Sequence, residues 1–210
     1  MSLALLFLMG VLPCFAGDRP QASQADGETI VMLRHGEKPT GGLGQLSCRG
    51  LNRSLALPSI LIGRYGKPDF IYAPDPGVKI KDGNPQPAYS YVRPLATIEP
   101  TAIFLGMPVN TQIGFDQIDA LEQELLQPAY AHSLIFVAWE HVMLHNLAGQ
   151  MLQTYGVSSP QLPSWPGDDY DTIYVFHIRR SGKNNTPQVT LDLQKEDLDG
   201  TLKDSCPSSQ

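Results

Sequence analysis

The sequence lacks the concentrated positive charge of a nucleic-acid-binding protein. Its 210 residues include 15 lysine and arginine residues against 21 aspartate and glutamate residues, a formal net charge of −6. The basic residues are scattered rather than gathered into a stripe that could follow a phosphate backbone. We therefore expect no nucleic-acid partner. An anionic ligand would need a local pocket of a few arginine or histidine side chains inside this acidic chain.

The sequence also lacks a hydrophobic run long enough to cross a bilayer comfortably. Leu3 to Gly17 is almost wholly apolar but short, and a polar run follows it. This pattern predicts a signal peptide over 1–17, a polar leader over 18–27, and export to the periplasm or the medium. No stable membrane association is expected after signal removal. An uncleaved anchor is the alternative, because no lysine or arginine precedes the apolar run.

Cysteine is scarce, with three residues in the whole chain. Removal of the predicted signal peptide takes Cys14 with it and leaves Cys48 and Cys206. An exported protein meets an oxidising compartment, where disulfides persist. A bridge between the tail and the first helix and two unpaired thiols both remain open, because the sequence does not report their separation.

The composition suits one globular domain with a sizeable core, since 42% of the residues are hydrophobic and 17% are charged. No internal repeat or low-complexity block divides the chain. We expect the domain to cover 28–196 and a polar, loosely held tail to cover 197–210.

Short apolar runs alternate with stretches of helical periodicity, which predicts an α/β fold with a mostly parallel sheet covered by helices on both faces. Pro58 is expected to end or kink the first helix, and 74–87 is expected to form a surface loop beside the site. The last two strands are expected to pair. The predicted strands are 29–33, 69–73, 133–138, 170–178 and 188–193. The predicted helices are 47–62, 90–105, 116–126 and a last one that follows the turn at 139–141 and runs to about residue 155.

Functional sites of such sheets lie where strands end and loops begin. Arg34-His35 and Glu140-His141 both fall at the end of a predicted apolar strand. The two histidines can therefore face one pocket although about a hundred residues separate them.

A strand that ends in Arg34-His35-Gly36 resembles the signature of the histidine phosphatase superfamily, the phosphoglycerate mutase-like proteins. Four further segments resemble family elements in the family's order, so that the resemblance covers about 30–178. They are Gly50 to Ser54 (Gly-x-x-Arg-Ala), Arg93 to Thr97 (Arg-Ala-x-x-Thr), Ser133 to His141 (the strand before the second catalytic histidine) and Asp168 to Asp171 (the approach to a late strand).

The resemblance implies a three-layer α/β/α sandwich and a phosphohydrolase that acts on small phosphomonoesters without a metal or another cofactor. His35 would form a phosphohistidine, while Arg34, Arg93 and His141 would hold the phosphoryl group. Two arginines suit this task, because a planar guanidinium matches phosphate oxygens and stays charged. A neutral imidazole can attack phosphorus. Mutase activity is less expected, since export favours net hydrolysis.

The proton donor to the leaving group is the least secure part of the resemblance, and Glu140 is our choice. Burial would raise the pKa of this carboxyl, and neighbouring arginines would oppose the rise. Glu37, Asp75 and Asp116 are the other candidates. The insertion from Asp75 to Tyr89, which departs from the family pattern, is a candidate specificity element. Substrate contacts are expected from Glu37, Lys38 and Thr97.

Two alternatives remain. His141 and His145 are four residues apart on a predicted helix, as two zinc ligands would be, although Val142 stands where the metalloprotease helix has glutamate. A zinc hydrolase would need a further ligand cluster that the sequence does not show. The second alternative is a protein of the same fold that binds phosphorylated ligands without turnover. The natural substrate and the oligomeric state are left open.

Overall fold

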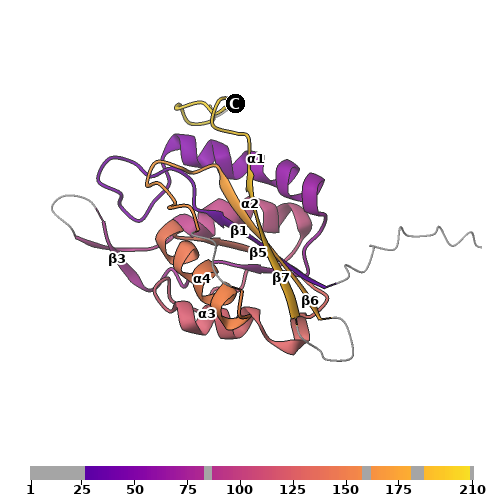
Figure 1. Ribbon diagram of the computed structural model, residues 1–210. Helices are drawn as coiled ribbons and strands as arrows, with labels where there is room; N and C mark the ends of the chain where they lie inside the picture. Colours follow the sequence, from indigo (N-terminus) through magenta and orange to yellow (C-terminus); the bar gives the residue numbers. More distant parts are fainter. Residues whose placement is uncertain (1–26, 83–86, 158–161, 181–186, 209–210) are drawn as a thin grey trace, which may run out of the picture.

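A central sheet lies between two pairs of helices in the computed structural model (Figure 1). The structure describes residues 27–82, 87–157, 162–180 and 187–208, so the predicted signal peptide and nearly all of the polar leader lie outside it. The five strands have the order β2 (Phe70–Tyr72), β5 (Leu134–Trp139), β1 (Glu28–Arg34), β6 (Thr172–Arg180) and β7 (Pro187–Lys195).

Strand direction confirms the expected mostly parallel sheet. β1 and β2 both pair with β5 in parallel, while β6 is antiparallel to both of its neighbours, β1 and β7. Four of the five strands therefore point the same way. The expected pairing of the last two strands is also confirmed.

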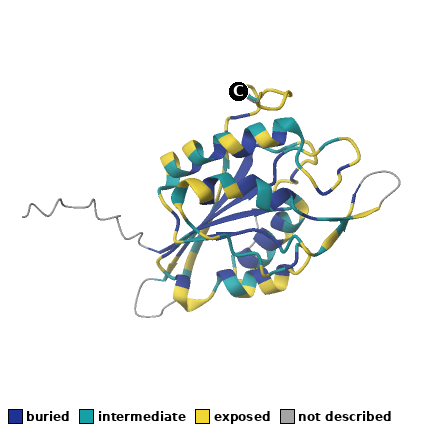
Figure 2. Ribbon diagram, turned by 180° about the vertical axis from the view of Figure 1, so that it is seen from behind, coloured by how far each residue is buried: buried dark blue, intermediate teal, exposed yellow. Residues whose placement is uncertain are grey.

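The core consists of two layers of side chains, one on each face of the sheet. Val31 and Leu33 of β1 pack with α1 (Cys48–Tyr65) and α2 (Arg93–Leu105). Ile30 and Met32 point the other way, toward α3 (Ile118–Leu125) and α4 (His141–Thr154). A short 3₁₀ helix, Pro128–Tyr130, precedes β5. Figure 2 shows the strands buried between helices whose outer faces are exposed, so the three-layer prediction is confirmed.

Both helices of the first layer run past a proline. Of the two outcomes expected at Pro58, an end or a kink of the helix, the end is wrong, because α1 continues to Tyr65. Leu57 and Leu61 are fully buried on either side of Pro58, and this packing outweighs the lost backbone hydrogen bond. Ser47 caps the start of α1 by accepting a hydrogen bond from the amide of Gly50. Helix α2 likewise passes Pro100 and begins at Arg93 rather than at residue 90.

The predicted surface loop over 74–87 is partly ordered. Lys79–Lys81 forms β3, which pairs antiparallel with β4 (Ala88–Ser90) to make a separate two-stranded sheet. Residues 83–86 lie outside the described part. Asp82, directly after β3, is only 7% exposed. Such burial of a charged side chain needs a partner that the sequence did not indicate.

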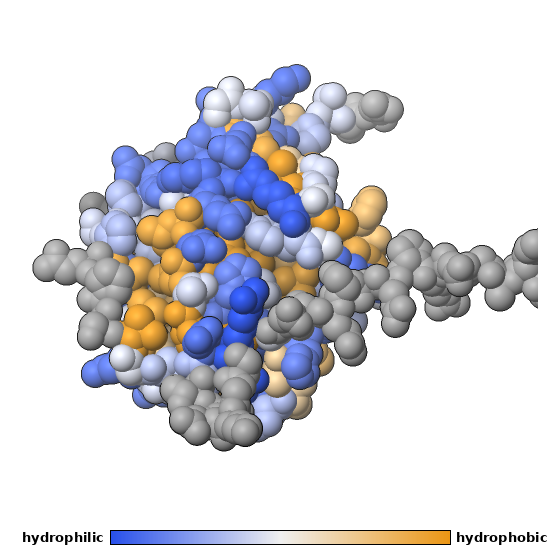
Figure 3. Space-filling model, turned by 45° about the vertical axis from the view of Figure 1, so that its right-hand side comes forward, coloured by the Kyte–Doolittle hydropathy of each residue, from blue (hydrophilic) through white to orange (hydrophobic). Residues whose placement is uncertain are grey.

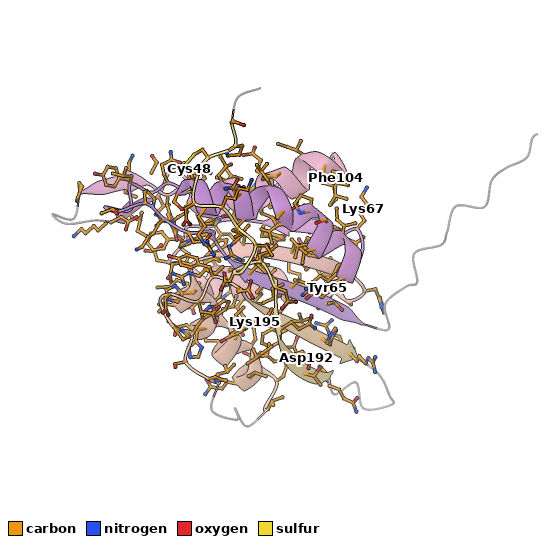
Figure 4. The ribbon with its side chains drawn as sticks, turned by 90° about the horizontal axis from the view of Figure 1, so that it is seen from above. Cys48, Tyr65, Lys67, Phe104, Asp192 and Lys195 are labelled. Carbon is orange, nitrogen blue, oxygen red and sulfur yellow. A yellow bond between two sulfur atoms is a disulfide. The ribbon has the colours of Figure 1, made fainter. Side chains whose placement is uncertain are left out.

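The expectation of a loosely held tail is wrong for the described residues 197–208. The tail follows α1 back toward its first turn (Figures 1 and 4), where Cys206 forms a disulfide with Cys48. The Arg49 guanidinium donates to the Leu202 carbonyl at 3.1 Å, and the Asn52 amide donates to two further tail carbonyls. Polar side chains on α1 therefore form hydrogen bonds with backbone carbonyls of the tail. The sequence did not predict this docking, because the tail has no hydrophobic periodicity.

The outer side of β7 carries an apolar groove. Figure 3 shows a hydrophobic area on this side of the molecule. The groove has a volume of about 410 Å³ and is lined by side chains of β7, the end of α4 and the segment after it, namely Leu152, Val157, Leu162, Pro163, Val189, Thr190, Leu191 and Leu193. Among the described helices, none combines the length and the apolar character needed to cross a bilayer.

Candidate active site

The ends of β1 and β5 bring the two predicted histidine segments together. Arg34 pairs with Trp139 in the parallel register, and the His35 amide donates to the Trp139 carbonyl at 2.9 Å. The next residues, Glu140 and His141, therefore leave the sheet beside His35. This convergence places both segments at the carboxyl edge of the sheet, as the sequence predicted.

His35 is held as a neutral imidazole with one ring nitrogen free. Its side chain is buried, and Nδ1 lies 2.7 Å from the Gly36 carbonyl oxygen. A carbonyl oxygen only accepts, so Nδ1 carries the proton and Nε2 keeps its lone pair. Burial lowers the pKa of His35 well below its usual value, and the positive charges of Arg93, Arg34 and His141 lower it further. A neutral imidazole with a free ring nitrogen has the form required of a nucleophile that needs no base to activate it.

Two glycines allow the close approach that positions this loop. A Cβ at Gly36 would lie 2.9 Å from the Gly50 carbonyl oxygen, and a Cβ at Gly50 would lie 2.4 Å from the Glu37 carbonyl oxygen. The backbone after β1 and the first turn of α1 thus touch directly. This single contact explains why both sequence motifs have glycine, at positions 36 and 50, because a larger residue at either position would clash with the other segment.

Arg34 is buried and oriented by the segment that precedes β6. Its Nη1 donates to the Asp169 carbonyl at 2.7 Å, and its guanidinium carbon lies 3.7 Å from the centre of the Tyr170 ring. The Tyr170 and His35 ring centres are 6.1 Å apart, so the tyrosine also flanks the nucleophile. The run Asp168 to Asp171, noted in the sequence, therefore supports the site through a backbone carbonyl and an aromatic ring.

Arg93 is anchored at one edge of its guanidinium and free at the other. Nη1 and Nη2 both donate to Oδ2 of Asp82 at 2.9 Å, and Nη1 also donates to the Gly42 carbonyl at 3.1 Å. Burial raises the pKa of Asp82, but the hydrogen bonds and charge of Arg93 outweigh it, so the pKa lies below its usual value. The Nε atom of Arg93 has no partner among the described residues. Asp82 thus positions the Arg93 guanidinium and leaves its Nε atom free to donate to a ligand.

Glu140 caps α4 and contacts the second histidine. Oε2 accepts from the Met143 amide at 2.9 Å, and Oε1 lies 2.5 Å from Nδ1 of His141. Burial raises the pKa of Glu140, but the contact with His141 and the helix amides lower it more, so the net shift is downward. The expectation of a raised pKa is wrong, because the sequence did not show that Glu140 is the N-cap. In the free protein Glu140 is a carboxylate.

The three predicted substrate contacts have other partners. Both oxygens of Glu37 accept from Arg53, at 2.8 and 3.0 Å, which directs this side chain toward α1. The Lys38 ammonium lies 3.5 Å from Asp82 and is 47% exposed. The buried Thr97 hydroxyl accepts from the Gly36 amide and donates to the Arg93 carbonyl, both at 2.9 Å. Glu37 and Thr97 therefore support the site rather than line it, and Lys38 lies at its margin.

The other candidate acids and the zinc pair are not assembled into a centre. Asp75 accepts from the Gly77 amide at 2.7 Å within its own turn, and Asp116 is exposed. Nδ1 of His145 faces the Tyr174 hydroxyl at 3.3 Å. In the part of the chain that the structure describes, no group of three or more histidine, cysteine, aspartate or glutamate side chains could hold a metal ion.

Several buried polar atoms of the site have no hydrogen-bond partner. They include three atoms that carry a hydrogen to donate, namely Nε of Arg34, Nε of Arg93 and the hydroxyl of Tyr91. Nδ1 of His141 also lacks a hydrogen bond, although it lies 2.5 Å from Oε1 of Glu140. Buried donors are nearly always satisfied in folded proteins, so a group of unsatisfied donors indicates a missing acceptor. The arrangement is suited to binding an anion that has several acceptor oxygens.

Asp82, Tyr91 and Tyr170 are members of the site that the sequence patterns did not indicate. Asp82 lay in a segment interpreted as a surface loop, and nothing in the sequence links it to Arg93. Tyr91 stands two residues before Arg93, so its proximity to that motif was the available signal. Tyr170 lies within the run already compared with the family, but an aromatic residue there has no distinctive spacing.

Comparison with known proteins agrees with this geometry at the level of the fold. No protein-family profile and no curated protein sequence matches the chain. A mycobacterial glucosyl-3-phosphoglycerate phosphatase superposes with a TM-score of 0.52 at 15% identity, over 79% of this chain and 97% of the phosphatase. A protein assigned as the phosphohistidine phosphatase SixA from Nakamurella multipartitia gives 0.52 at 17% identity, over 82% and 98%.

A third similar structure is the phosphoglycerate mutase of Plasmodium falciparum, with a TM-score of 0.50 at 13% identity, over 79% of this chain and 89% of the mutase. The mycobacterial phosphatase has also been solved with inorganic phosphate. These likenesses confirm the fold that the Arg34-His35-Gly36 motif implied. The chain has the phosphoglycerate mutase-like fold.

Proposed function

We propose that the protein is a phosphohydrolase that acts on small phosphomonoesters through a phosphohistidine at His35, without a metal. The observation that carries this proposal is a neutral, buried imidazole with Nε2 free, next to unsatisfied donors on Arg34, Arg93 and Tyr91. A phosphoryl group in transfer spreads negative charge over three equatorial oxygens and is stabilised by preorganised donors of this kind.

The reaction divides into two displacements. Nε2 of His35 attacks phosphorus, the bond between phosphorus and the ester oxygen breaks, and the leaving oxygen takes up a proton. Water then attacks the phosphohistidine, which releases inorganic phosphate and restores the imidazole. His141, whose Nδ1 faces Glu140, would present Nε2 to a phosphoryl oxygen in both steps.

Glu140 as the proton donor stays a prediction, and its lowered pKa weighs against it. Glu140→Gln keeps an oxygen that can cap α4 but removes the acidic proton. If Glu140 is the donor, this variant will hydrolyse alkyl phosphates far more slowly and aryl phosphates, which are better leaving groups, nearly normally. An equal loss for both substrates would exclude the role.

The direct test is hydrolysis of p-nitrophenyl phosphate by the purified protein in excess chelator. We expect turnover that chelator does not change, loss of turnover in His35→Ala, and acid-labile label trapped on His35. Activity lost in chelator and restored by zinc would favour the zinc alternative. A protein that binds phosphate but shows no turnover would be the non-catalytic binder.

We also propose that the protein is exported. The apolar segment 3–17 supports this proposal, and so does the disulfide between Cys48 and Cys206, because cytosolic thiols are kept reduced. Fractionation of the producing cells, with free-thiol labelling of the recovered protein, tests it. Recovery of a fully reduced protein from the cytosol would contradict the proposal.

A further inference from the structure

The hydroxyl of Tyr91 is the most unusual group beside His35. Tyr91 connects β4 to α2, is fully buried, and its hydroxyl has no hydrogen-bond partner among the described residues. Its ring meets the His35 ring edge-on, with centres 6.0 Å apart, and the Arg93 guanidinium carbon lies 5.2 Å from the Tyr91 ring centre. The hydroxyl therefore lies among the groups proposed to hold the phosphoryl group.

Packing alone does not account for this hydroxyl. The Tyr91 ring packs against Phe115, with ring centres 5.2 Å apart, and phenylalanine would make the same contact without burying a polar atom. An unsatisfied buried hydroxyl destabilises the free protein. Tyrosine at this position is explained if the hydroxyl has a partner that the free protein lacks.

The partner must be a hydrogen-bond acceptor. Burial raises the pKa of Tyr91, and the negative charge of Glu140 raises it further. The charge and polar contact of the Arg93 side chain and the charge of Arg34 only partly oppose that rise, so the phenol keeps its proton. Nε of Arg34 and Nε of Arg93 are the other unsatisfied donors of the site. Three donors around one nucleophile match the oxygens of a phosphoryl group rather than a single leaving-group oxygen.

We propose that the Tyr91 hydroxyl donates a hydrogen bond to an oxygen of the transferring phosphoryl group, as a further catalytic residue. This inference rests on the proposed phosphohydrolase function and adds to the site a neutral donor that the sequence motifs do not include. The hydrogen bond forms only when substrate or inorganic phosphate is bound.

Tyr91→Phe tests the proposal, and Tyr72→Phe is its matched control. Tyr72 is also buried, but its hydroxyl contacts Glu124 at 2.7 Å and Tyr130 at 2.8 Å. We expect Tyr91→Phe to melt at the same temperature as wild type or higher, and to bind inorganic phosphate roughly 10- to 100-fold more weakly. Tyr72→Phe should melt lower and bind phosphate like wild type.

Binding of inorganic phosphate is measured by calorimetry on the full chain, and kcat/KM is measured for aryl phosphates that differ in leaving-group acidity. The same fold-loss for every leaving group supports contact with the phosphoryl oxygens. A loss that grows with poorer leaving groups would overturn this assignment, and so would phosphate affinity within twofold of wild type. If wild-type protein neither binds phosphate nor hydrolyses aryl phosphates, the proposed function itself fails.

Discussion

Two arginine clusters at the same end of the sheet show opposite balances of donors and acceptors. At the candidate site, Arg34, Arg93 and Tyr91 leave donors without partners. On the buried side of α1, Arg53 is fully buried and its guanidinium donates to four acidic side chains, those of Glu37, Asp171, Glu196 and Asp199. The first cluster has donors free for an anion from outside, whereas in the second every nitrogen of the Arg53 guanidinium already donates to an acidic side chain.

This difference in unpaired donors distinguishes arginines that can bind a ligand from arginines that stabilise the fold. An arginine surrounded by carboxylates stabilises the structure that brings them together, here the loop after β1, the start of β6 and the tail. An arginine anchored mainly by backbone carbonyls, as Arg34 is, keeps its charge available for a ligand. Residue type alone therefore does not reveal which arginine has which task.

The largest expected effect is on stability, from Arg53→Met. This variant leaves buried carboxylates without their cation, and breaking a buried ion pair in this way costs about 3–5 kcal/mol. Urea unfolding of both proteins at neutral pH measures it. A loss below about 1 kcal/mol would show that the Arg53 cluster does not hold the fold together.

Arg34→Met should reduce activity strongly and stability only slightly, the opposite of what we expect for Arg53→Met. We expect kcat/KM for p-nitrophenyl phosphate to fall roughly 100- to 1000-fold, as for removal of a preorganised donor to a developing charge. Its free energy of unfolding should change less than that of Arg53→Met, because no carboxylate loses its partner. Equal losses of stability in the two variants would remove the distinction between the clusters.

Replacing both disulfide cysteines, in Cys48→Ser/Cys206→Ser, tests whether the tail belongs to the folding cluster alone. The bridge joins residues 158 positions apart, and its loss is expected to lower the free energy of unfolding by about 2–4 kcal/mol. At a temperature where the variant stays folded, kcat should be unchanged, since neither cysteine contributes a side chain to the site. A kcat that falls with the bridge would connect the tail to the site.

The smallest effect expected is a change in pH dependence in Glu196→Gln. Burial raises the pKa of Glu196 to about 8, and the carboxylates of Asp171 and Glu37 help to hold it there against the opposing charge of Arg53. The folded state therefore binds a proton that the unfolded state has lost, so this contribution to stability disappears as pH rises from about 4.5 to about 8. Free energies of unfolding measured at pH 5, 7 and 9 should show that the stability of the variant relative to wild type increases with pH. A constant difference would mean that Glu196 is ionised throughout.

The sequence was most informative where local patterns coincide with the fold. Alternating apolar strands and helices predicted the layers, and the convergence of His35 with His141 followed from the position of both at strand ends. Prediction failed where a long-range polar contact decides the outcome. The pairing of Asp82 with Arg93, the capping role of Glu140 and the docking of the tail are contacts between segments that have no shared periodicity.

The sequence by itself determined the order of strands and helices, the motif residues around His35, and the position of the nucleophile at a strand end. Only the tertiary structure decided which charged side chains neutralise one another and which donors remain free. The physical reason is that hydrophobic burial follows short repeating patterns along the chain, whereas the partner of a buried charge is set by distances between segments that meet only after folding.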